Sequence, residues 1–475
     1  MKKKILFIAG ESMPFASSGG LGDVIGSLPA ALTEASEDCD VRVIMPLYSA
    51  ITDEYRQKFE YIKYTFINLS WRREYCGIFR YVYKGVTYYF LDNERYFKRF
   101  NLYGEFDDGE RFAFFCRAAL EILPEIDFFP DILHAHDWHA ALSVIYLKRC
   151  YCYDDRYKDI KAFFTIHNIQ YQGIYDFSLL GDIFGLMPSD HGIVEYDGAI
   201  NLLKGAVVCA DQVTTVSPTY SREILSPKFS HGLDSVLNMF SFKLTGILNG
   251  IDRDFYNPSK DKELFANFSY RNLEGKQICK SGLQRMLGLP ERDVPLIAVI
   301  SRLVSHKGLD LVMLAGDDIL KEDVQLVVLG QGDKSYENYF ESLAERYPDK
   351  CKALITYNRD LSKKIYSAAD IFLMPSRSEP CGLAQMISSR YGAVPVIHET
   401  GGLYDSIKDF GCEGGGNGFT FAAYSAYEML NSVNRAGGLY RFERAKFEDL
   451  RKKVMRVDFS WKKSALSYIE LYNKF

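Results

Sequence analysis

Short apolar runs alternate with longer amphipathic stretches through the first half of the chain. Buried β-strands are expected in four of these runs, at residues 4–10, 41–48, 131–138 and 161–168. A glycine-rich loop and an amphipathic helix are expected over residues 19–36. A further strand begins at residue 212, and a helix should start after Ser217 because Pro218 suits a first helical position. This alternation predicts a parallel sheet covered by helices.

Residues 51–110 depart from this alternation and have an aromatic, two-stranded pattern. Residues 75–93 resemble a β-hairpin whose short turn lies at Lys84 and Gly85. We expect this hairpin to be an insertion on the parallel core.

A second unit begins near residues 248–258, where Asn249, Gly250 and Pro258 mark a loop suited to an interdomain crossing. Beyond it, strands are expected at residues 295–303, 324–332, 353–358, 370–376 and 394–402. Each is followed by a helical pattern, which predicts a second doubly wound unit. Residues 461–475 form a final expected helix, with Ser460 as its cap.

The expected fold class is α/β, with two doubly wound Rossmann-like domains facing a central cleft. A chain of 475 residues is too long for one ordinary hydrophobic core. We expect domains at residues 1–250 and 251–455, and a C-terminal helix within 456–475 that crosses back to the first domain.

Charge and composition exclude several classes of protein. The net charge of -5 argues against nucleic acid as a partner, which would need a basic face. No run of about 18 apolar residues is present to span a membrane, and the apolar run at residues 5–9 is too short for a signal peptide. The ten cysteines are scattered without a CxxC pair, which indicates reduced thiols in a cytoplasmic protein.

Two glycine-rich turns are candidate phosphate cradles. One contains Gly19 and Gly20, and the other contains Gly401 and Gly402. Backbone N–H groups in such turns can approach an anion, and the positive end of the following helix points at the same place. For either turn alone, a tight turn without a ligand is an equal alternative. Asp23 either caps its helix or accepts a sugar hydroxyl.

Three charged residues follow predicted strand ends, where ligands of open α/β sheets bind. Arg302 and Lys307 can neutralise a leaving diphosphate without a metal, and Glu379 can stabilise positive charge at an anomeric carbon. The alternatives are solvated surface charges for the first two residues and a helix-start carboxylate for the third. Together with the glycine turns, they predict a cleft where a group attached to a nucleotide diphosphate is transferred.

A run of polar residues at His134, His136, Asp137 and His139 has the composition of a metal site. Metal hydrolases of the HxHxDH type place the aspartate two positions after the second histidine, whereas Asp137 follows His136 directly. A metal site is therefore disfavoured, and we expect these side chains to be strand-end polar groups.

His167 and Asn168 end another predicted strand. They can hold sugar hydroxyls, or present a backbone carbonyl near a reaction centre. The alternative for an isolated strand-end histidine is a structural role.

Along nearly its full length the sequence resembles the bacterial glycogen synthases, which are retaining α-glucan glucosyltransferases. The resemblance rests on an ordered series of segments: GGLGDVIGSLPAAL, HAHDWHAAL, TIHNIQYQG, LNGID, SRLVSHKGLDLV, SEPCGLAQM and HETGGLYDSI. It implies a GT-B fold, a cytoplasmic location, ADP-glucose as donor and the non-reducing end of an α-1,4-glucan, such as glycogen or a maltooligosaccharide, as acceptor. It implies no metal and no other cofactor. The first domain would be the acceptor side and the second would bind the nucleotide sugar.

The resemblance also implies roles for particular residues. Arg302 and Lys307 resemble a diphosphate-binding pair, Glu379 an essential carboxylate near the donor glucose, and His167 the histidine beneath the anomeric carbon. Further substrate contacts are implied at Gly19, Gly20, Asp23, Asp137, Asn168, Asn249, Tyr357, Cys381, Gly382, Leu383, Thr400, Gly401 and Gly402. Among these, Tyr357 is similar to a tyrosine that stacks on adenine.

Two positions depart from the family pattern. The family usually reads K-[TV]-G-G-L before its first helix, but Ser17 stands where the lysine is expected. Related enzymes also carry a second carboxylate eight positions after the first, where this chain has Ile387. The first departure leaves two alternatives: a related synthase that uses UDP-glucose or another acceptor, and a catalytically weakened glucan-binding protein. Retention of the expected catalytic residues argues against the second.

Overall fold

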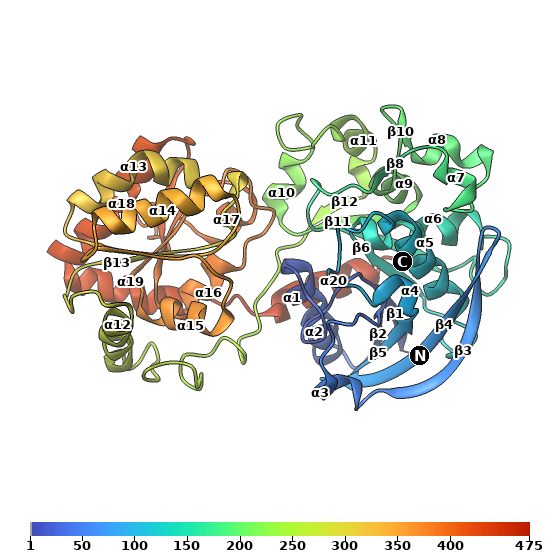
Figure 1. Ribbon diagram of the computed structural model, residues 1–475, viewed down its shortest axis with the longest axis horizontal. Helices are drawn as coiled ribbons and strands as arrows, with labels where there is room; N and C mark the ends of the chain where they lie inside the picture. The colour runs from blue at the N-terminus through green and yellow to red at the C-terminus, as the bar shows by residue number, and fades with distance from the viewer. Residues whose placement is uncertain (1) are drawn as a thin grey trace. The chain divides into compact units, whose positions relative to one another are not determined.

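The computed structural model describes residues 2–475 and divides into two compact units (Figure 1). The N-terminal unit contains the chain up to Asn249 together with Trp461–Phe475, and the C-terminal unit contains Gly250–Ser460. Among residues 2–475, no helix is both long enough and apolar enough to cross a membrane.

The N-terminal unit is built on a nine-stranded sheet with the order β12-β11-β7-β6-β1-β2-β5-β4-β3. All neighbours are parallel except β3–β4 and β4–β5. The strands are β1 (Lys3–Ile8), β2 (Cys39–Pro46), β3 (Glu60–Leu69), β4 (Arg72–Tyr83), β5 (Val86–Asp92), β6 (Ile132–His136), β7 (Lys161–Ile166), β11 (Gln212–Thr215) and β12 (Leu244–Gly246). A separate three-stranded sheet has the order β8-β10-β9 and comprises β8 (Ile174–Tyr175), β9 (Glu195–Tyr196) and β10 (Ala199–Asn201).

The predicted hairpin is confirmed as β4 and β5. Lys84 and Gly85 form its turn with φ angles of 48° and 77°, the left-handed pair of a tight hairpin. The prediction of only two strands is wrong, because β3 pairs with β4 and forms the edge of the sheet. On β3, Ile67 and Leu69 are buried whereas Tyr64 and Phe66 are exposed, so the strand has one solvent face.

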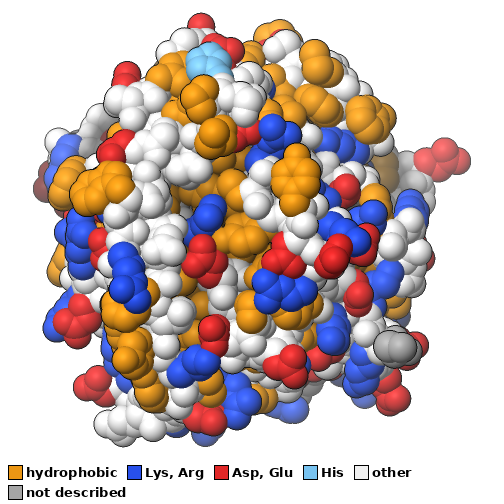
Figure 2. Space-filling model, turned by 90° about the vertical axis from the view of Figure 1, so that its right-hand side faces the viewer, with side chains coloured by type: hydrophobic (Ala, Val, Ile, Leu, Met, Phe, Trp, Pro, Cys, Tyr) orange, Lys and Arg blue, Asp and Glu red, His pale blue; other side chains and the backbone are white. Residues whose placement is uncertain are grey.

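The face seen in Figure 2 shows hydrophobic side chains lying among basic and acidic ones.

The helix expected over residues 19–36 is divided into α1 (Gly20–Ile25) and α2 (Leu28–Ala35). Gly26 ends α1, and Pro29 lies in the first turn of α2, where its missing N–H costs nothing. The predicted start at Pro218 is confirmed, since the Ser217 side chain accepts a hydrogen bond from Tyr220 N. The other helices of this unit are α3 (Asp53–Arg56), α4 (Glu94–Phe97), α5 (Asp108–Glu121), α6 (Trp138–Arg149), α7 (Leu179–Asp182), α8 (His191–Val194), α9 (Leu202–Cys209), α10 (Pro218–Glu223) and α11 (Asp234–Met239).

The last helix of the chain, α20 (Trp461–Tyr472), belongs to the N-terminal unit. It packs against α2, and Lys3 Nζ of β1 donates to Tyr472 O at 2.7 Å. The Tyr472 hydroxyl lies 2.7 Å from His134 Nδ1. The two ends of the chain are therefore joined within one unit.

The C-terminal unit has a six-stranded parallel sheet with the order β15-β14-β13-β16-β17-β18. Its strands are β13 (Leu296–Ile300), β14 (Gln325–Leu329), β15 (Cys351–Leu354), β16 (Ile371–Met374), β17 (Val394–His398) and β18 (Phe419–Phe421). Its helices are α12 (Glu274–Leu287), α13 (Leu309–Lys321), α14 (Lys334–Arg346), α15 (Arg359–Ala368), α16 (Ala384–Arg390), α17 (Gly401–Ser406), α18 (Ala426–Phe442) and α19 (Arg444–Arg456).

The strand predicted at residues 353–358 lies earlier, because its last residues start a helix. Asn358 is the N-cap of α15, and its side chain accepts a hydrogen bond from Leu361 N at 2.9 Å. The chain must leave the sheet before this cap, so β15 ends at Leu354.

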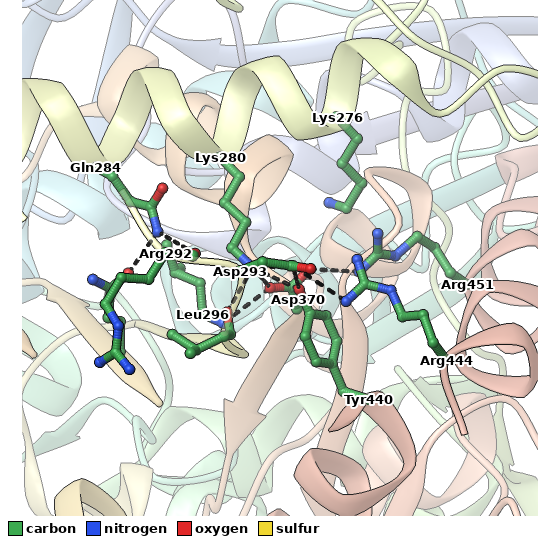
Figure 3. Close-up of polar contacts among 12 residues, drawn as sticks. Lys276, Lys280, Gln284, Arg292, Asp293, Leu296, Asp370, Tyr440, Arg444 and Arg451 are labelled. Atoms are coloured by element: carbon green, nitrogen blue, oxygen red, sulfur yellow. Dashed lines mark hydrogen bonds and ion pairs between the residues drawn. The ribbon is translucent and has the colours of Figure 1, made fainter. Parts of the chain in front are cut away.

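A buried charge network joins α12 to the amino end of β16 (Figure 3). Asp370 accepts hydrogen bonds from Lys280 Nζ at 2.7 Å and from Arg451 Nη2 at 2.5 Å. Lys276 Nζ donates to the carbonyls of Ser367 and Tyr391 at 2.9 and 2.7 Å. Because these charges are buried away from water, removal of any one partner would leave another charge without compensation.

Candidate functional site

The chain order reverses once in each parallel sheet, and the reversal marks where a ligand site is expected. In the N-terminal unit, β1 and β2 lie in chain order on one side of the reversal. On its other side, β6, β7 and β11 follow one another outward in chain order. In the C-terminal unit the reversal lies between β13 and β16. Ligands of such sheets bind beyond the carboxyl ends of the strands at these points. The predicted residues Gly19, Asp137, Arg302 and Glu379 follow β1, β6, β13 and β16, the strands at these reversals, so each unit has candidate site residues there.

The C-terminal reversal brings Lys307 and Glu379 together. Lys307 Nζ lies 2.7 Å from Glu379 Oε2, and Ser376 Oγ donates to the same oxygen at 3.0 Å. The loops after β13 and β16 approach closely at Gly308, where φ is 72° and a Cβ atom would lie 1.9 Å from Pro375 O. Only glycine permits this approach, which places the lysine beside the carboxylate.

The loop after β17 completes this group. Gly402 N donates to Glu379 O at 3.1 Å. Gly401 has a φ of 44°, and a Cβ atom there would lie 2.0 Å from the same carbonyl oxygen. The glycine-rich loop predicted as a phosphate cradle therefore packs backbone to backbone against the Glu379 loop.

The alternatives for these charged residues are now decided in part. Glu379 is buried and precedes the first residue of α16, Ala384, so it is not a helix-start carboxylate. Lys307 is half-buried and paired, so it is not a solvated surface charge. Arg302 is exposed, and its guanidinium forms no hydrogen bond or ion pair with any residue in 2–475. Arg302 is thus a cation available to a ligand at the carboxyl end of β13.

Cys381, Gly382 and Leu383 connect Glu379 to α16. Cys381 is buried, and Gly382 adopts a φ of 71°. Leu383 occupies the N-cap position of α16. These residues fix the path of the loop that carries Glu379.

Asp137 lies at the reversal of the N-terminal sheet, directly after β6. Its Oδ1 accepts hydrogen bonds from His167 N at 2.7 Å and from Asn168 N at 3.5 Å. Its φ of 56° lies in a region that non-glycine residues rarely adopt. Burial raises the pKa of the Asp137 carboxyl to about 7, against the opposing effect of the two N–H groups. Such backbone strain costs about 1–3 kcal/mol and concentrates at functional sites.

The imidazoles of His134 and His136 on β6 and of His167 directly after β7 form a buried group without charge near neutral pH. His136 Nδ1 and His167 Nε2 lie 3.0 Å apart. Burial lowers the pKa of His167 to about 3 and the pKa of His136 well below its usual value. His134 lies between the hydroxyls of Tyr472 and Thr165, at 2.7 and 2.6 Å. Within residues 2–475 no group of three or more His, Cys, Asp or Glu side chains is placed to hold a metal ion.

The glycine-rich loop after β1 is held by a residue to which the sequence analysis gave no role, Glu11. Its side chain is buried and accepts hydrogen bonds from Ser18 N, from Ser18 Oγ at 2.9 Å and from Gly22 N at 3.3 Å. Burial raises the pKa of Glu11 to about 7. A carboxylate between a buried strand and a glycine loop is the sequence signal that would have indicated it.

Tyr103 is a second residue that the sequence did not indicate. Its ring stacks on His139 with centroids 4.0 Å apart, and its hydroxyl is buried without a hydrogen-bond partner in residues 2–475. A buried polar atom without a partner is uncommon and is expected where a ligand supplies one. One tyrosine among 33 carries no signal of its own in the sequence.

Several predicted residues lie apart from these contacts. Tyr357 is 81% exposed on the loop after the edge strand β15, and it forms no ring contact in the described chain. Asn249 is buried, and its Oδ1 has no hydrogen-bond partner among the described residues. Gly19, and not Asp23, is the N-cap of α1, so the capping interpretation of Asp23 is wrong. Gly20 is exposed at the start of that helix.

Ser17 turns back onto its own loop. Its Oγ donates to Gly19 O at 3.1 Å. A Cβ atom on Gly22 would lie 2.2 Å from the Ser17 Oγ. Ser17 is exposed, so a longer side chain has space at this position. The cation expected from the family pattern is therefore replaced by a short, self-satisfied hydroxyl.

Comparison with known families gives matches over both units. The model of the starch synthase catalytic domain matches residues 4–239, and that of the glycosyl transferases group 1 matches residues 287–437.

Individual relatives match over the whole chain. A glycogen synthase from Desulforamulus reducens is 47% identical over 475 residues, which cover 99% of this chain and 98% of the relative. A glycogen synthase from Streptococcus pneumoniae is 45% identical over 474 residues, covering 99% of each chain. Among solved structures, the catalytic domain of starch synthase IV from Arabidopsis thaliana, bound to ADP and acarbose, superposes with a TM-score of 0.92. It is 34% identical, and the match covers 100% of this chain and 99% of that one.

Proposed function

Because this chain belongs to the family of glycogen and starch synthases, we propose that it transfers glucose from ADP-glucose to the non-reducing end of an α-1,4-glucan, with retention of configuration. The chain is a hexosyltransferase with the GT-B fold. The observation that carries the proposal is the Lys307–Glu379 pair at the reversal of the C-terminal sheet, where the loop that carries Lys307 also carries the exposed Arg302.

In this proposal the C-terminal unit holds the donor. Arg302 and Lys307 neutralise the diphosphate as it leaves. The Gly401–Gly402 loop, whose Gly402 N–H donates to Glu379 O, holds the Glu379 loop in place. The bond between the anomeric carbon and the diphosphate oxygen breaks, and charge moves onto the phosphate. Cations already in place stabilise this charge without having to rearrange during the reaction.

Glu379 is assigned to the positive charge that develops on the sugar. The anomeric carbon becomes positive as the diphosphate departs, and a fixed carboxylate stabilises that charge. The acceptor hydroxyl then attacks from the face that the diphosphate leaves. Its proton passes to the departing phosphate oxygen, so no separate base is needed. The new C–O bond therefore has the configuration of the broken one.

The N-terminal unit contributes groups that position the glucose. Asp137 is fixed by the His167 and Asn168 N–H groups and presents its carboxyl group to sugar hydroxyls. The lowered pKa of His167 keeps its ring neutral at pH 7, so its role is that of a neutral hydrogen-bonding group or a backbone carbonyl, not an acid. Tyr357 is assigned to stacking on the adenine base, for which its exposed ring is free.

The proposed partners are the ADP-glucose donor and glycogen or a maltooligosaccharide as acceptor. We also propose a cytoplasmic location, which is supported by the ten free cysteines. The test is incorporation of labelled glucose into glycogen from ADP-glucose and, separately, from UDP-glucose. We expect ADP-glucose to be the better donor. Transfer from UDP-glucose alone, or from neither donor, would overturn the proposal.

A further inference from the structure

The loop that carries Glu379 begins where β16 leaves the sheet. Met374 is the last residue of β16 and pairs with Ile397 of β17. Pro375 follows, and it has no N–H group to donate to a neighbouring strand. From Ser376 onward the backbone therefore needs hydrogen-bond partners outside the sheet ladder.

Two neighbouring segments hold the peptide between Ser376 and Arg377. The Ser376 carbonyl oxygen lies 2.8 Å from Nδ1 of His398, the last residue of β17. A carbonyl oxygen only accepts hydrogen bonds, so Nδ1 carries the proton and donates it. On the other side, Arg377 N donates to His306 O at 2.9 Å, in the loop after β13. One peptide plane is thus fixed at both its C=O end and its N–H end.

The same short turn sets the contacts of the Glu379 carboxylate. Ser376 Oγ donates to Glu379 Oε2 at 3.0 Å, and Lys307 Nζ lies 2.7 Å from that oxygen. The peptide between Ser376 and Arg377 is planar, so rotating it changes the backbone dihedral angles of the residues on both sides. Such a rotation would separate Ser376 Oγ from the carboxylate. The His398 hydrogen bond therefore helps to set the direction in which Glu379 points.

The His398 ring is itself held in place. It is buried and packs against Phe421 and Tyr424, with ring centroids 5.4 and 5.3 Å away. The Tyr424 hydroxyl donates to Asp310 Oδ1 at 2.6 Å, which joins this group to α13. Because packed neighbours restrict its rotamer, the ring keeps Nδ1 directed at the Ser376 carbonyl.

We propose that His398 is a positioning residue for Glu379. The role of Glu379 opposite a developing positive charge rests on the proposed function. A carboxylate stabilises that charge well only at the right distance and angle, and a displacement of about 1 Å can cost about 100-fold in rate. The His398 hydrogen bond holds the Glu379 loop in this position before substrate binds. It contributes to kcat and not to the affinity for the donor.

The test compares two amide side chains that place their donor differently. In His398→Asn, Nδ2 takes the place of the ring Nδ1, whereas in His398→Gln the donor lies one bond further from the backbone. We expect kcat for transfer from ADP-glucose to glycogen to fall about 10- to 100-fold in His398→Gln. In His398→Asn it should stay within about threefold of wild type, and the KM for the donor should change little in both variants.

Two further variants serve as controls. His398→Leu fills most of the place of the ring without a donor and should behave like His398→Gln. His191→Gln should leave kcat unchanged, because His191 is exposed on α8 in the N-terminal unit. Equal kcat values in His398→Asn and His398→Gln would overturn the proposal.

Hydrogen exchange gives a readout that does not depend on activity. Mass spectrometry of peptides that span residues 375–383 should show faster amide exchange in His398→Gln than in wild type, and near wild-type exchange in His398→Asn. Peptides from β13 should exchange as in wild type in both variants, which excludes general unfolding. Exchange over residues 375–383 that is unchanged in His398→Gln also overturns the proposal. If wild type transfers no glucose but exchange follows the expected order, the positioning by His398 is supported and only the proposed function fails.

Discussion

Lys307 Nζ lies 2.7 Å from Glu379 Oε2, although 72 positions separate the two residues in the chain. The sequence indicated one as a phosphate-binding cation and the other as a carboxylate near a sugar. Their contact means that each holds the other in place, and that neither can be changed without affecting its partner.

We expect Lys307→Ala and Glu379→Gln each to lower kcat by at least about 100-fold, because each removes a charge that stabilises the transition state. Glu379→Gln should change donor affinity little, since it keeps the size and hydrogen-bonding ability of the side chain. Steady-state kinetics with ADP-glucose and glycogen measure both effects. A Glu379→Gln variant with normal kcat and weaker donor binding would show that Glu379 only binds substrate.

Arg302→Ala should also lower kcat by about 100-fold, but without any loss of stability. The reason is that the Arg302 side chain is exposed and makes no hydrogen bond or ion pair within residues 2–475. Arg285→Ala is the control, because Arg285 is an exposed arginine on α12. Kinetics and urea unfolding of both variants are the measurements. Normal turnover in a folded Arg302→Ala protein would remove this residue from the site.

Ser17→Lys introduces the cation that the family pattern leads us to expect at this position. Because Ser17 is exposed and bonds only within its loop, a lysine should fit and should raise kcat/KM for ADP-glucose. The expected gain corresponds to about 1–3 kcal/mol at low salt and should shrink as salt screens the charge. Kinetics with ADP-glucose and UDP-glucose over a range of salt concentrations test this. No gain with either donor would mean that the loop functions with serine as it stands.

Glu11 should make stability depend on pH. Burial raises its pKa from 4.5 to about 7, so the folded state binds a proton more tightly than the unfolded state. The stabilisation is complete below pH 4.5 and is lost as pH rises to about 7, by up to about 3 kcal/mol. Asp137, whose pKa is also raised to about 7, acts in the same direction.

Glu11→Gln removes this titration while keeping an acceptor for Ser18 N. Its free energy of unfolding, relative to that of wild type, should therefore be larger at pH 8 than at pH 5, because only the wild type loses stability as pH rises. Urea unfolding at the two pH values measures the difference. An equal difference at both values would show that Glu11 is ionised in the folded protein throughout this range.

Asp370→Asn should destabilise the C-terminal unit by about 3–5 kcal/mol, because Lys280 and Arg451 would both lose their buried counter-charge. Asp318→Asn, which breaks an exposed pair with Lys321, should change stability by less than about 1 kcal/mol. Urea unfolding compares the two. Asp370 lies at the amino end of β16 and Glu379 beyond its carboxyl end, so kcat of the folded Asp370→Asn protein should be unchanged. A small loss of stability would mean that water reaches the network.

The sequence by itself determined most strand positions, because short apolar runs between polar segments are a local signal. It also determined the hairpin turn at Lys84 and Gly85 and the helix start at Pro218, which depend on one or two residues each. The strand expected at residues 353–358 was misplaced because the cap formed by Asn358 is stronger than the apolar pattern before it. The candidate residues after β13 and β16 were found because glycines and charges follow apolar runs there.

Only the tertiary structure decided which of these residues meet. The Lys307–Glu379 pair depends on the order of β13 and β16 in the sheet and on the close approach at Gly308, and neither is encoded in local pattern. Glu11 gained its role because folding buries its carboxylate against the amides of a loop. Gln172, Asn201 and His231 come from segments that share no motif, yet they line one surface hollow beside β10. Contacts of this kind arise from packing over long sequence separations, and an apolar or polar periodicity does not specify them.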